Sequence, residues 1–137
     1  MASEKFRTEV LTPEGKVFDD EVEMVSTRTS VGSIGLLAHH EPVLAILDPT
    51  ELRLYKSESD VERFAQSEGY LQFAENRALV LVEEAHRPDQ LDAGTLRERL
   101  HEADRQLEGA EEDSEKRRTA ERDKRRWELF LQIAEGS

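Results

Sequence analysis

The stretch ALVLVEEAHRPDQLDAGTLRERLHEADRQL, residues 78–107, contains the change of periodicity that decides the fold of this chain. Before the pair Arg87-Pro88, the sequence consists of short apolar runs separated by turn-forming residues. After it, apolar residues recur at helical spacing, namely at Leu96, Leu100, Ala103 and Leu107. Side chains repeat every two residues on a strand and about every 3.6 residues on a helix, so one type of element cannot account for both halves. The sequence therefore predicts a β domain followed by helices.

The N-terminal half is predicted to form a series of short strands. Phe6, Thr8 and Val10 alternate with charged residues, which is the pattern of a strand with one buried face. Residues 12–15 have the proline and glycine of a tight turn. Further apolar runs lie at residues 17–18, 22–26, 34–37, 43–47, 52–55, 61–65, 70–74 and 78–82. Strands at this spacing, with no helical stretch between them, predict an antiparallel β-sandwich, and we place residues 78–82 centrally because both of their faces are apolar.

The C-terminal half predicts two helices that form a hairpin. Asp92 or Thr95 can cap the first helix, Gly109 can end it, and Asp113 or Ser114 can begin the second. The second helix has no apolar stripe before its last turns, where Trp127, Phe130, Leu131 and Ala134 lie. We expect these turns to pack on the first helix and to leave residues 115–126 mostly in water, a marginal arrangement that permits a second, extended state. The expected domains are a sandwich at 1–86, a linker at 87–91 and a helical domain at 92–137.

The composition argues against several classes of partner. The formal net charge of -12 opposes binding to nucleic acid or to an anionic lipid surface. The chain has no cysteine and therefore no disulfide framework. It shows neither a long apolar run nor a basic, apolar start, so we expect no membrane span and no secretory signal.

One segment, residues 116–126, contains a run of seven basic residues. A run of this kind is usually a solvated face of a helix. The alternative is a surface that docks against an acidic protein.

The only cluster with the residue types of a metal or acid–base site is His39-His40-Glu41. Adjacent histidines point to opposite faces of an extended segment, and zinc needs three or four ligands, so we expect no metal site there. No serine lies in a nucleophile elbow, and we expect no catalytic residue and no enzyme activity of the chain itself. Gly32-Ser33-Ile34-Gly35 is too short for a dinucleotide-binding motif and indicates a turn or bulge that needs glycine.

Several motifs follow one another in a specific order. Val25-Ser26 precedes the block Gly32-x-x-Gly35-x-Leu37-x-x-His40-x-Pro42, and Glu68-Gly69-Tyr70-Leu71 precedes the strand at 78–82. With the opening segment at 10–15, they resemble the epsilon subunit of bacterial and chloroplast F-type ATP synthases. The resemblance covers nearly the whole chain, because that family also has a sandwich followed by two helices.

The resemblance implies a non-catalytic subunit of the rotor that helps to couple proton flow to ATP synthesis. Its sandwich would contact the gamma subunit and the membrane ring of c subunits. The ring would be faced by a loop spanning residues 30–40, with Ser30, Val31, Gly32, Ser33, Ile34, Gly35 and His40. The chain would lie peripherally on the cytoplasmic face of the bacterial inner membrane, rather than on the chloroplast thylakoid, and would meet the membrane only through the complex.

The resemblance also implies that the helices either fold on the sandwich or extend along gamma to the catalytic alpha and beta subunits, where they inhibit ATP hydrolysis. The residues expected to dock there are Arg117, Arg118, Arg122, Arg125 and Arg126. Some members bind ATP on the hairpin through a segment like Ile/Leu-Asp-x-x-Arg-Ala, whose nearest counterparts here are Asp92 and Arg97. Thr95 stands at the arginine position and removes a bidentate phosphate donor, so we expect neither bound ATP nor another cofactor.

Two other hypotheses remain open on the residues alone. One is a free-standing acidic adaptor whose tail folds on an unrelated partner. The other is a small metal-dependent enzyme that uses His39, His40 and Glu41, which would hold a stoichiometric metal.

Overall fold

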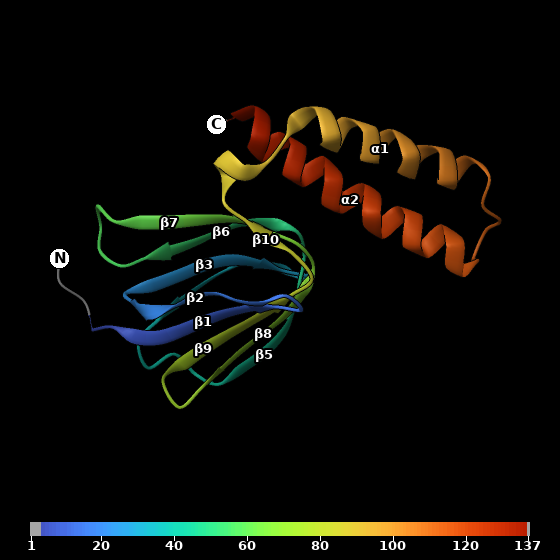
Figure 1. Ribbon diagram of the computed structural model, residues 1–137. Coiled ribbons are helices and arrows are strands. Elements are labelled where there is room, and N and C mark those ends of the chain that lie inside the picture. Colours follow the sequence, from blue (N-terminus) through green and yellow to red (C-terminus); the bar gives the residue numbers. More distant parts are fainter. Residues whose placement is uncertain (1–3, 137) are drawn as a thin grey trace. The chain divides into compact units, whose positions relative to one another are not determined.

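The computed structural model describes residues 4–136, which form two compact units that divide between Arg87 and Pro88. The first unit consists of strands and the second of helices (Figure 1). The predicted order of a β-sandwich followed by a helical hairpin is therefore confirmed. Residues 1–3 and 137 of the predicted domains lie outside the described residues.

The strands agree closely with the predicted apolar runs. They are β1 (Phe6–Thr12), β2 (Gly15–Val22), β3 (Met24–Thr29), β4 (Gly32–Leu37), β5 (Val43–Leu47), β6 (Thr50–Tyr55), β7 (Val61–Gln66), β8 (Gly69–Ala74), β9 (Arg77–Val82) and β10 (Ala85–His86). The predicted run at 22–26 is divided, because β2 ends at Val22 and β3 begins at Met24. In the second unit a short 3-10 helix, η1 (Pro88–Gln90), precedes α1 (Ala93–Glu108) and α2 (Glu115–Gly136).

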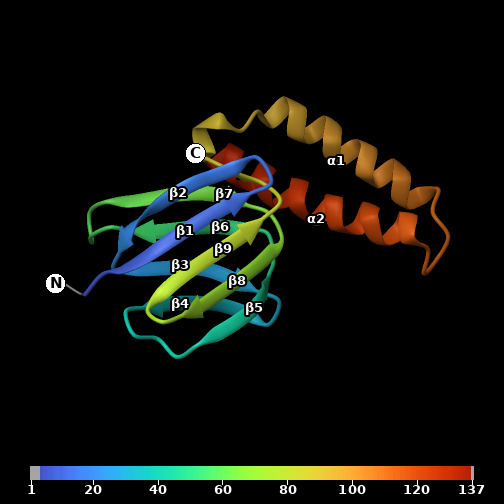
Figure 2. The same ribbon diagram turned by 60° about the horizontal axis from the view of Figure 1, so that its bottom comes forward.

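The strands form two layers of one continuous sheet, in the order β10-β7-β6-β3-β5-β8-β9-β1-β2, with β4 beside β3. β3 and β5 share a single pair, Thr29 with Leu47, where the sheet passes from one layer to the other. Figure 2 shows β1, β9, β8 and β5 side by side in one layer. The pairing of β1 with β9 is parallel, a local exception that the expectation of an antiparallel sandwich did not include. Parallel neighbours need a long crossover, and here most of the sandwich lies between the two strands in sequence.

The core lies between the layers and is formed by alternate residues of the strands. Phe6 of β1 packs edge-on against Phe73 of β8, with ring centroids 5.4 Å apart. From β9, Ala78, Val80 and Val82 point into the core. β9 lies between β8 and β1, which confirms its predicted central position.

Two buried threonines of the sandwich differ in how their hydroxyl groups are satisfied. Thr27 of β3 lies 2.5 Å from Oε1 of the buried Gln66, to which its hydroxyl donates. Thr8 of β1 is fully buried, and its Oγ1 has no hydrogen-bond partner. A buried hydroxyl without a partner costs free energy that an apolar group of the same shape would not. The hydroxyl group of Thr8 therefore lowers the stability of the sandwich.

We expect Thr8→Val to stabilise the sandwich by about 1 kcal/mol, because valine fills the same volume without a hydroxyl to desolvate. Thr27→Val is the matched control, and it should destabilise the sandwich by about 1–2 kcal/mol because it removes a bonded hydroxyl. Urea denaturation followed by circular dichroism in the β-sheet band measures both. A loss of stability in Thr8→Val would show that its hydroxyl has a partner in solution.

The helical hairpin has the expected caps. Asp92 is the N-cap of α1, and Gly109, as its C-cap, donates its N–H to the carbonyl of Arg105. Ser114 precedes α2, and its Oγ accepts from the N–H of Arg117 at 3.1 Å. Asp113 has a φ of 59°, so it makes the turn before that cap.

The set of side chains that are buried in the hairpin agrees with the expectation only in part. Leu96, Ala103 and Phe130 are buried as the apolar pattern predicts. Ala120 and Arg126 are buried as well, so the prediction that residues 115–126 are mostly in water is wrong at these two positions. Ala120 is buried because it lies on the side of α2 that faces α1, where it lines the same hollow as Ala103.

Candidate docking surfaces

The block predicted to face the c ring is a hairpin rather than one loop. β3 and β4 pair from Met24 with Leu37 to Thr29 with Gly32, which leaves Ser30 and Val31 at the tip. The φ of Gly32 is 139°, so the fold needs glycine there, as predicted. Gly35 has no such need, because an added Cβ would meet only Sδ of Met24, at 3.9 Å.

The structure separates the two ends of this block. Val31 is 95% exposed at the tip, whereas His40 follows the far end of β4, where its N–H donates to the carbonyl of Leu37. A strand of six residues places these ends roughly 17–20 Å apart. The prediction of a single loop at residues 30–40 is therefore wrong, because residues 32–37 form a strand that pairs with β3 along its whole length.

The histidines at 39 and 40 have ordinary polar partners. His39 lies 2.6 Å through Nε2 from Oε2 of Glu4, and its N–H donates to Oδ1 of Asn76. Nδ1 of His40 lies 2.7 Å from the carbonyl of Glu41, and its ring packs edge-on against Phe73. Within residues 4–136, no three His, Asp or Glu side chains lie together as a metal site would require.

The basic residues of α2 do not all share one surface. Arg118, Arg122 and Arg125 are exposed and lie four and three residues apart, which puts them on one helix face. Arg117 is half-buried and pairs with Glu121 at 3.0 Å. Arg126 is only 8% exposed, so the structure does not present it with the others. The basic face of α2, as the structure displays it, therefore consists of Arg118, Arg122 and Arg125.

The two candidate nucleotide residues take part in holding the hairpin. Asp92 accepts hydrogen bonds from the N–H of Gly94 and from Oγ1 of Thr95, and the bond from Thr95 lowers the pKa of Asp92. Nη2 of Arg97 donates to Oε2 of Glu135 at 2.7 Å and so joins the start of α1 to the end of α2. Thr95, which stands at the position of the motif arginine, thus holds the side chain of the N-cap residue Asp92. A nucleotide bound through these residues would break these contacts.

The outer face of the layer β5-β8-β9-β1 carries an apolar row that the sequence argument did not identify. Ile46 pairs with Tyr70, Tyr70 with Leu81, and Leu81 with Leu11, so the four side chains lie in register across four neighbouring strands. Ile46 and Tyr70 are each 58% exposed, and Leu81 is 41% exposed. The sequence did contain an indication of this row. The runs at 43–47 and 78–82 are apolar at every position, so they must place apolar side chains on both faces of the sheet.

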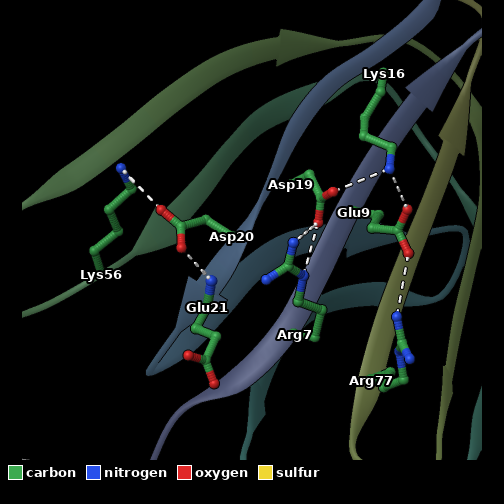
Figure 3. A network of polar contacts seen from close by, with 8 residues as sticks. All are labelled: Arg7, Glu9, Lys16, Asp19, Asp20, Glu21, Lys56 and Arg77. Atoms are coloured by element: carbon green, nitrogen blue, oxygen red, sulfur yellow. Dashed lines mark hydrogen bonds and ion pairs between the residues drawn. The ribbon is translucent and has the colours of Figure 1, made fainter.

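Beyond the apolar row, the same face becomes charged toward β2. Glu9 accepts from Lys16 at 3.0 Å and lies 3.6 Å from Arg77, while Asp19 pairs with Lys16 and with Arg7 (Figure 3). The hydrogen bond that Lys16 donates to Asp19 lowers the pKa of Asp19 and raises the pKa of Lys16. These five side chains, three basic and two acidic, are therefore all paired within the sheet and together carry a net charge of only +1.

A hollow of about 300 Å³ lies alongside the apolar row, where β1 and β9 end and β8 begins. Its wall includes Leu11, Tyr70 and Leu81 from the row itself. Glu68 and Glu83 also line it, and Glu83 is exposed. The outer face thus runs from an acidic hollow, across apolar side chains, to a region of paired charges.

The fold and these surfaces define a two-part protein in which a β-sandwich is followed by a charged helical hairpin. The family model of the ATP synthase delta/epsilon chain β-sandwich domain matches residues 5–88. An ATP synthase epsilon chain of Persephonella marina is 36% identical over 127 residues, covering 92% of this chain and 93% of the relative. That of Sulfurihydrogenibium sp. is 30% identical over 129 residues, covering 94% and 96%.

Solved structures share the fold at lower identity. A chain of the Euglena gracilis mitochondrial ATP synthase, with OSCP, F1 and the c-ring, matches with a TM-score of 0.78 at 19% identity and covers 95% of this chain and 82% of that one. A chain of the central stalk and c-ring of the Tetrahymena thermophila mitochondrial ATP synthase matches with a TM-score of 0.60 at 17% identity, covering 98% and 99%.

The chain belongs to the ATP synthase delta/epsilon chain family, as its motifs predict. The hypothesis of an unrelated adaptor is not favoured, because the relatives match through both the sandwich and the helices. None of the helices within residues 4–136 is both long enough and apolar enough to cross a membrane.

Proposed function

We propose that this chain is a non-catalytic rotor subunit in the central stalk of an F-type ATP synthase. There it helps to couple proton translocation to ATP synthesis and restrains ATP hydrolysis through its helices. Its partners are the gamma subunit, the c ring and, when the helices extend, the alpha and beta subunits. It reaches the cytoplasmic face of the bacterial inner membrane only through this complex.

The observation that carries this proposal is the match of curated epsilon chains over more than nine-tenths of the chain, helices included. The weak apolar content of the hairpin supports a conditional role for it. Two ion pairs between exposed side chains join its helices, Arg97 with Glu135 and Lys124 with Asp104. Exposed pairs of this kind contribute little to stability, so a partner surface can compete for the helices. Ser30 to Gly35 and His40 are proposed to face the c ring from the two ends of β4.

The test measures ATP hydrolysis by a matching catalytic complex reconstituted with the full chain or with a chain that lacks residues 89–137. We expect the full chain to lower the rate and its truncation to restore it several-fold, while circular dichroism shows that the sandwich remains folded. Full inhibition by the truncated chain would contradict the role of the helices. Failure of the full chain to bind the complex at all would contradict the rotor assignment.

The basic face of α2 is tested in the same assay with Arg118→Glu/Arg125→Glu. Reversing both charges should remove most of the inhibition, because the proposed site on the beta subunits is acidic. Arg105→Glu, which changes an exposed arginine of α1, is the matched control and should leave inhibition nearly intact. Equal inhibition by all three proteins would exclude this face as the docking site.

A further inference from the structure

The outer face of the other layer, formed by β4, β3, β6 and β7, is positively charged although the sandwich as a whole is acidic. Residues 1–85 contain 17 acidic and 8 basic side chains, a net charge of -9. The charged side chains that point outward from these four strands are three arginines and one glutamate, which gives +2. They are Arg28, Arg53, Arg63 and Glu51.

The strand pairing brings the arginines together. Arg53 of β6 pairs directly with Arg63 of β7 and, on its other side, with Ser26 of β3. Arg28 lies two residues beyond Ser26 on β3, so it belongs to the same face. Like charges that lie directly opposite each other on neighbouring strands destabilise a sheet. The stability of the sandwich therefore gives no reason for placing Arg63 beside Arg53.

The arginines of this face have too few carboxylate partners. Nε of Arg53 donates to Oε1 of Glu51 at 2.6 Å, and Nη1 of Arg63 lies 4.0 Å from Oε2 of the same residue. Arg28 has no ion-pair partner within residues 4–136. All three arginines are exposed. They can accept further carboxylates from outside the chain.

A second apolar row runs beside the arginines, two residues along the strands. Its members are paired in register across the four strands, and they are Leu37, Met24, Tyr55 and Val61. Leu37 is 55% exposed and the other three are half-buried. Positions two residues apart on a strand are separated by roughly 7 Å, and three strand spacings make the row roughly 14 Å long.

These dimensions fit an amphipathic helix that lies across the strands. A helix of about ten residues is about 15 Å long and about 10 Å wide, so an apolar stripe and a neighbouring acidic stripe can cover both rows at once. At physiological salt, charges are screened beyond about 8 Å, so a narrow helix meets mainly the local positive charge. A membrane or a nucleic acid extends beyond this face and is repelled by the rest of the sandwich.

We propose that the outer face of β4, β3, β6 and β7 binds an acidic amphipathic helix of a partner protein. Apolar residues of that helix cover Leu37 and Tyr55, and its Asp or Glu side chains pair with Arg28, Arg53 and Arg63. Charge-assisted hydrogen bonds from guanidinium to carboxylate fix the orientation of the helix. The proposal goes beyond the proposed function, because it involves neither the outer face of the β5-β8-β9-β1 layer nor the helices of the chain.

The test uses the full chain and a fluorescein-labelled synthetic peptide of roughly 15 residues, with a leucine stripe bordered by a glutamate stripe. Fluorescence anisotropy should show saturable binding. A second peptide with glutamine at every glutamate position should bind roughly tenfold more weakly or worse, because it keeps the apolar stripe and loses the charges. Equal affinities of the two peptides would overturn the pairing with arginine.

Two variants of the chain identify the face. Arg28→Glu and Arg63→Glu should each weaken binding of the glutamate peptide roughly tenfold or more and reduce the dependence of the affinity on salt. Arg77→Glu is the matched control, because it makes the same change of charge on β9 of the other layer, at a side chain that is 63% exposed. It should change the affinity by no more than about threefold. Equal losses in all three variants would show a response to net charge alone and would overturn the proposal.

The second apolar row is tested separately with Leu37→Ser. This variant should weaken binding of the glutamate peptide by roughly threefold or more, because it removes apolar surface from the contact. Leu44→Ser is the matched control, since Leu44 is 78% exposed on β5 of the other layer, and it should leave the affinity unchanged. Circular dichroism verifies that all the variants are folded. An unchanged affinity in Leu37→Ser would overturn the placement of the leucine stripe over this row.

Two further measurements distinguish other occupants of the face. We expect the chain not to sediment with phosphatidylglycerol vesicles, and sedimentation that Arg63→Glu abolishes would make the occupant a membrane and overturn the proposal. We also expect a monomer in sedimentation equilibrium, and a dimer that Arg63→Glu abolishes would make the occupant a second copy, with the same consequence. None of these measurements involves gamma or the catalytic complex, so the proposed function stands or falls separately.

Discussion

Gly69→Ala is expected to destabilise the sandwich by roughly 3 kcal/mol or more, because the site has no space for a methyl group. Gly69 begins β8, where it pairs with Val82 of β9 and with Leu47 of β5. A Cβ at this position would lie 2.0 Å from the carbonyl oxygen of Leu81 and 2.8 Å from Cα of Val82. Both contacts are with backbone, so neither can be relieved by rotating a side chain.

Gly35→Ala is the matched control, since it makes the same change in a strand of the same sandwich. An added Cβ there meets only Sδ of Met24, at 3.9 Å, which is ordinary van der Waals contact. The free energy of unfolding should change by no more than about 0.5 kcal/mol. Urea denaturation of both variants provides the comparison. Equal stability would show that β8 and β9 can separate to admit a methyl group.

These two glycines both lie in recognisable sequence motifs, but only one of them is required by the fold. Gly69 belongs to the segment Glu68-Gly69-Tyr70-Leu71, and its role is structural, since the backbone of β9 passes against it. Gly35 belongs to the block at 32–40, yet the fold does not need it. The motif was recognisable in the sequence in both cases. Whether the fold needs a glycine at such a position depends on neighbours distant in sequence, which only the folded chain identifies.

The sequence predicted the elements well because periodicity is a local property. The strands, the caps at Asp92 and Ser114, and the helix end at Gly109 all follow from residues within a few positions of each other. The parallel pairing of β1 with β9 could not be predicted in this way, because alternation in a strand does not identify its neighbour. The identity of the pairing partners is what brings Leu11 beside Leu81 and so creates the apolar row.

The candidate sites were predicted less completely, for a related reason. Five arginines of α2 were grouped by their closeness in sequence, but a helix distributes adjacent residues around its axis. Arg125 and Arg126 therefore have opposite environments, one exposed and one buried. In the same way, Val31 and His40 were assigned to one loop but lie at opposite ends of a strand. Charge and motif could be read from the sequence, whereas shared surfaces required the structure.

The side chain of Gln66 is a buried polar link that the sandwich depends on. It is fully buried at the end of β7. Its Oε1 accepts from Thr27 of β3, and its Nε2 donates to the carbonyls of Asp48 at 2.9 Å and Ser67 at 3.3 Å. One amide thus joins β7, β3 and the turn between β5 and β6. Because Thr27 and Ser67 are themselves buried, water does not replace the amide beside them when it is removed.

Gln66→Ala is expected to cost about 3 kcal/mol, because it leaves a cavity and deprives the Thr27 hydroxyl and the Asp48 carbonyl of a partner. Gln72→Ala, at an exposed position of β8, is the matched control and should change stability by no more than about 0.5 kcal/mol. Urea denaturation of the two variants measures the difference.

A double-mutant cycle separates the hydrogen bond from the cavity. Gln66→Leu nearly restores the lost volume but leaves Thr27 without its acceptor, and Thr27→Val removes the orphaned hydroxyl. The combined variant should therefore be less destabilised than the sum of the two single changes, by about 1 kcal/mol or more. Strict additivity would mean that the Thr27–Gln66 contact contributes nothing, and that the cost of Gln66→Ala arises from the cavity and from the turn at Asp48.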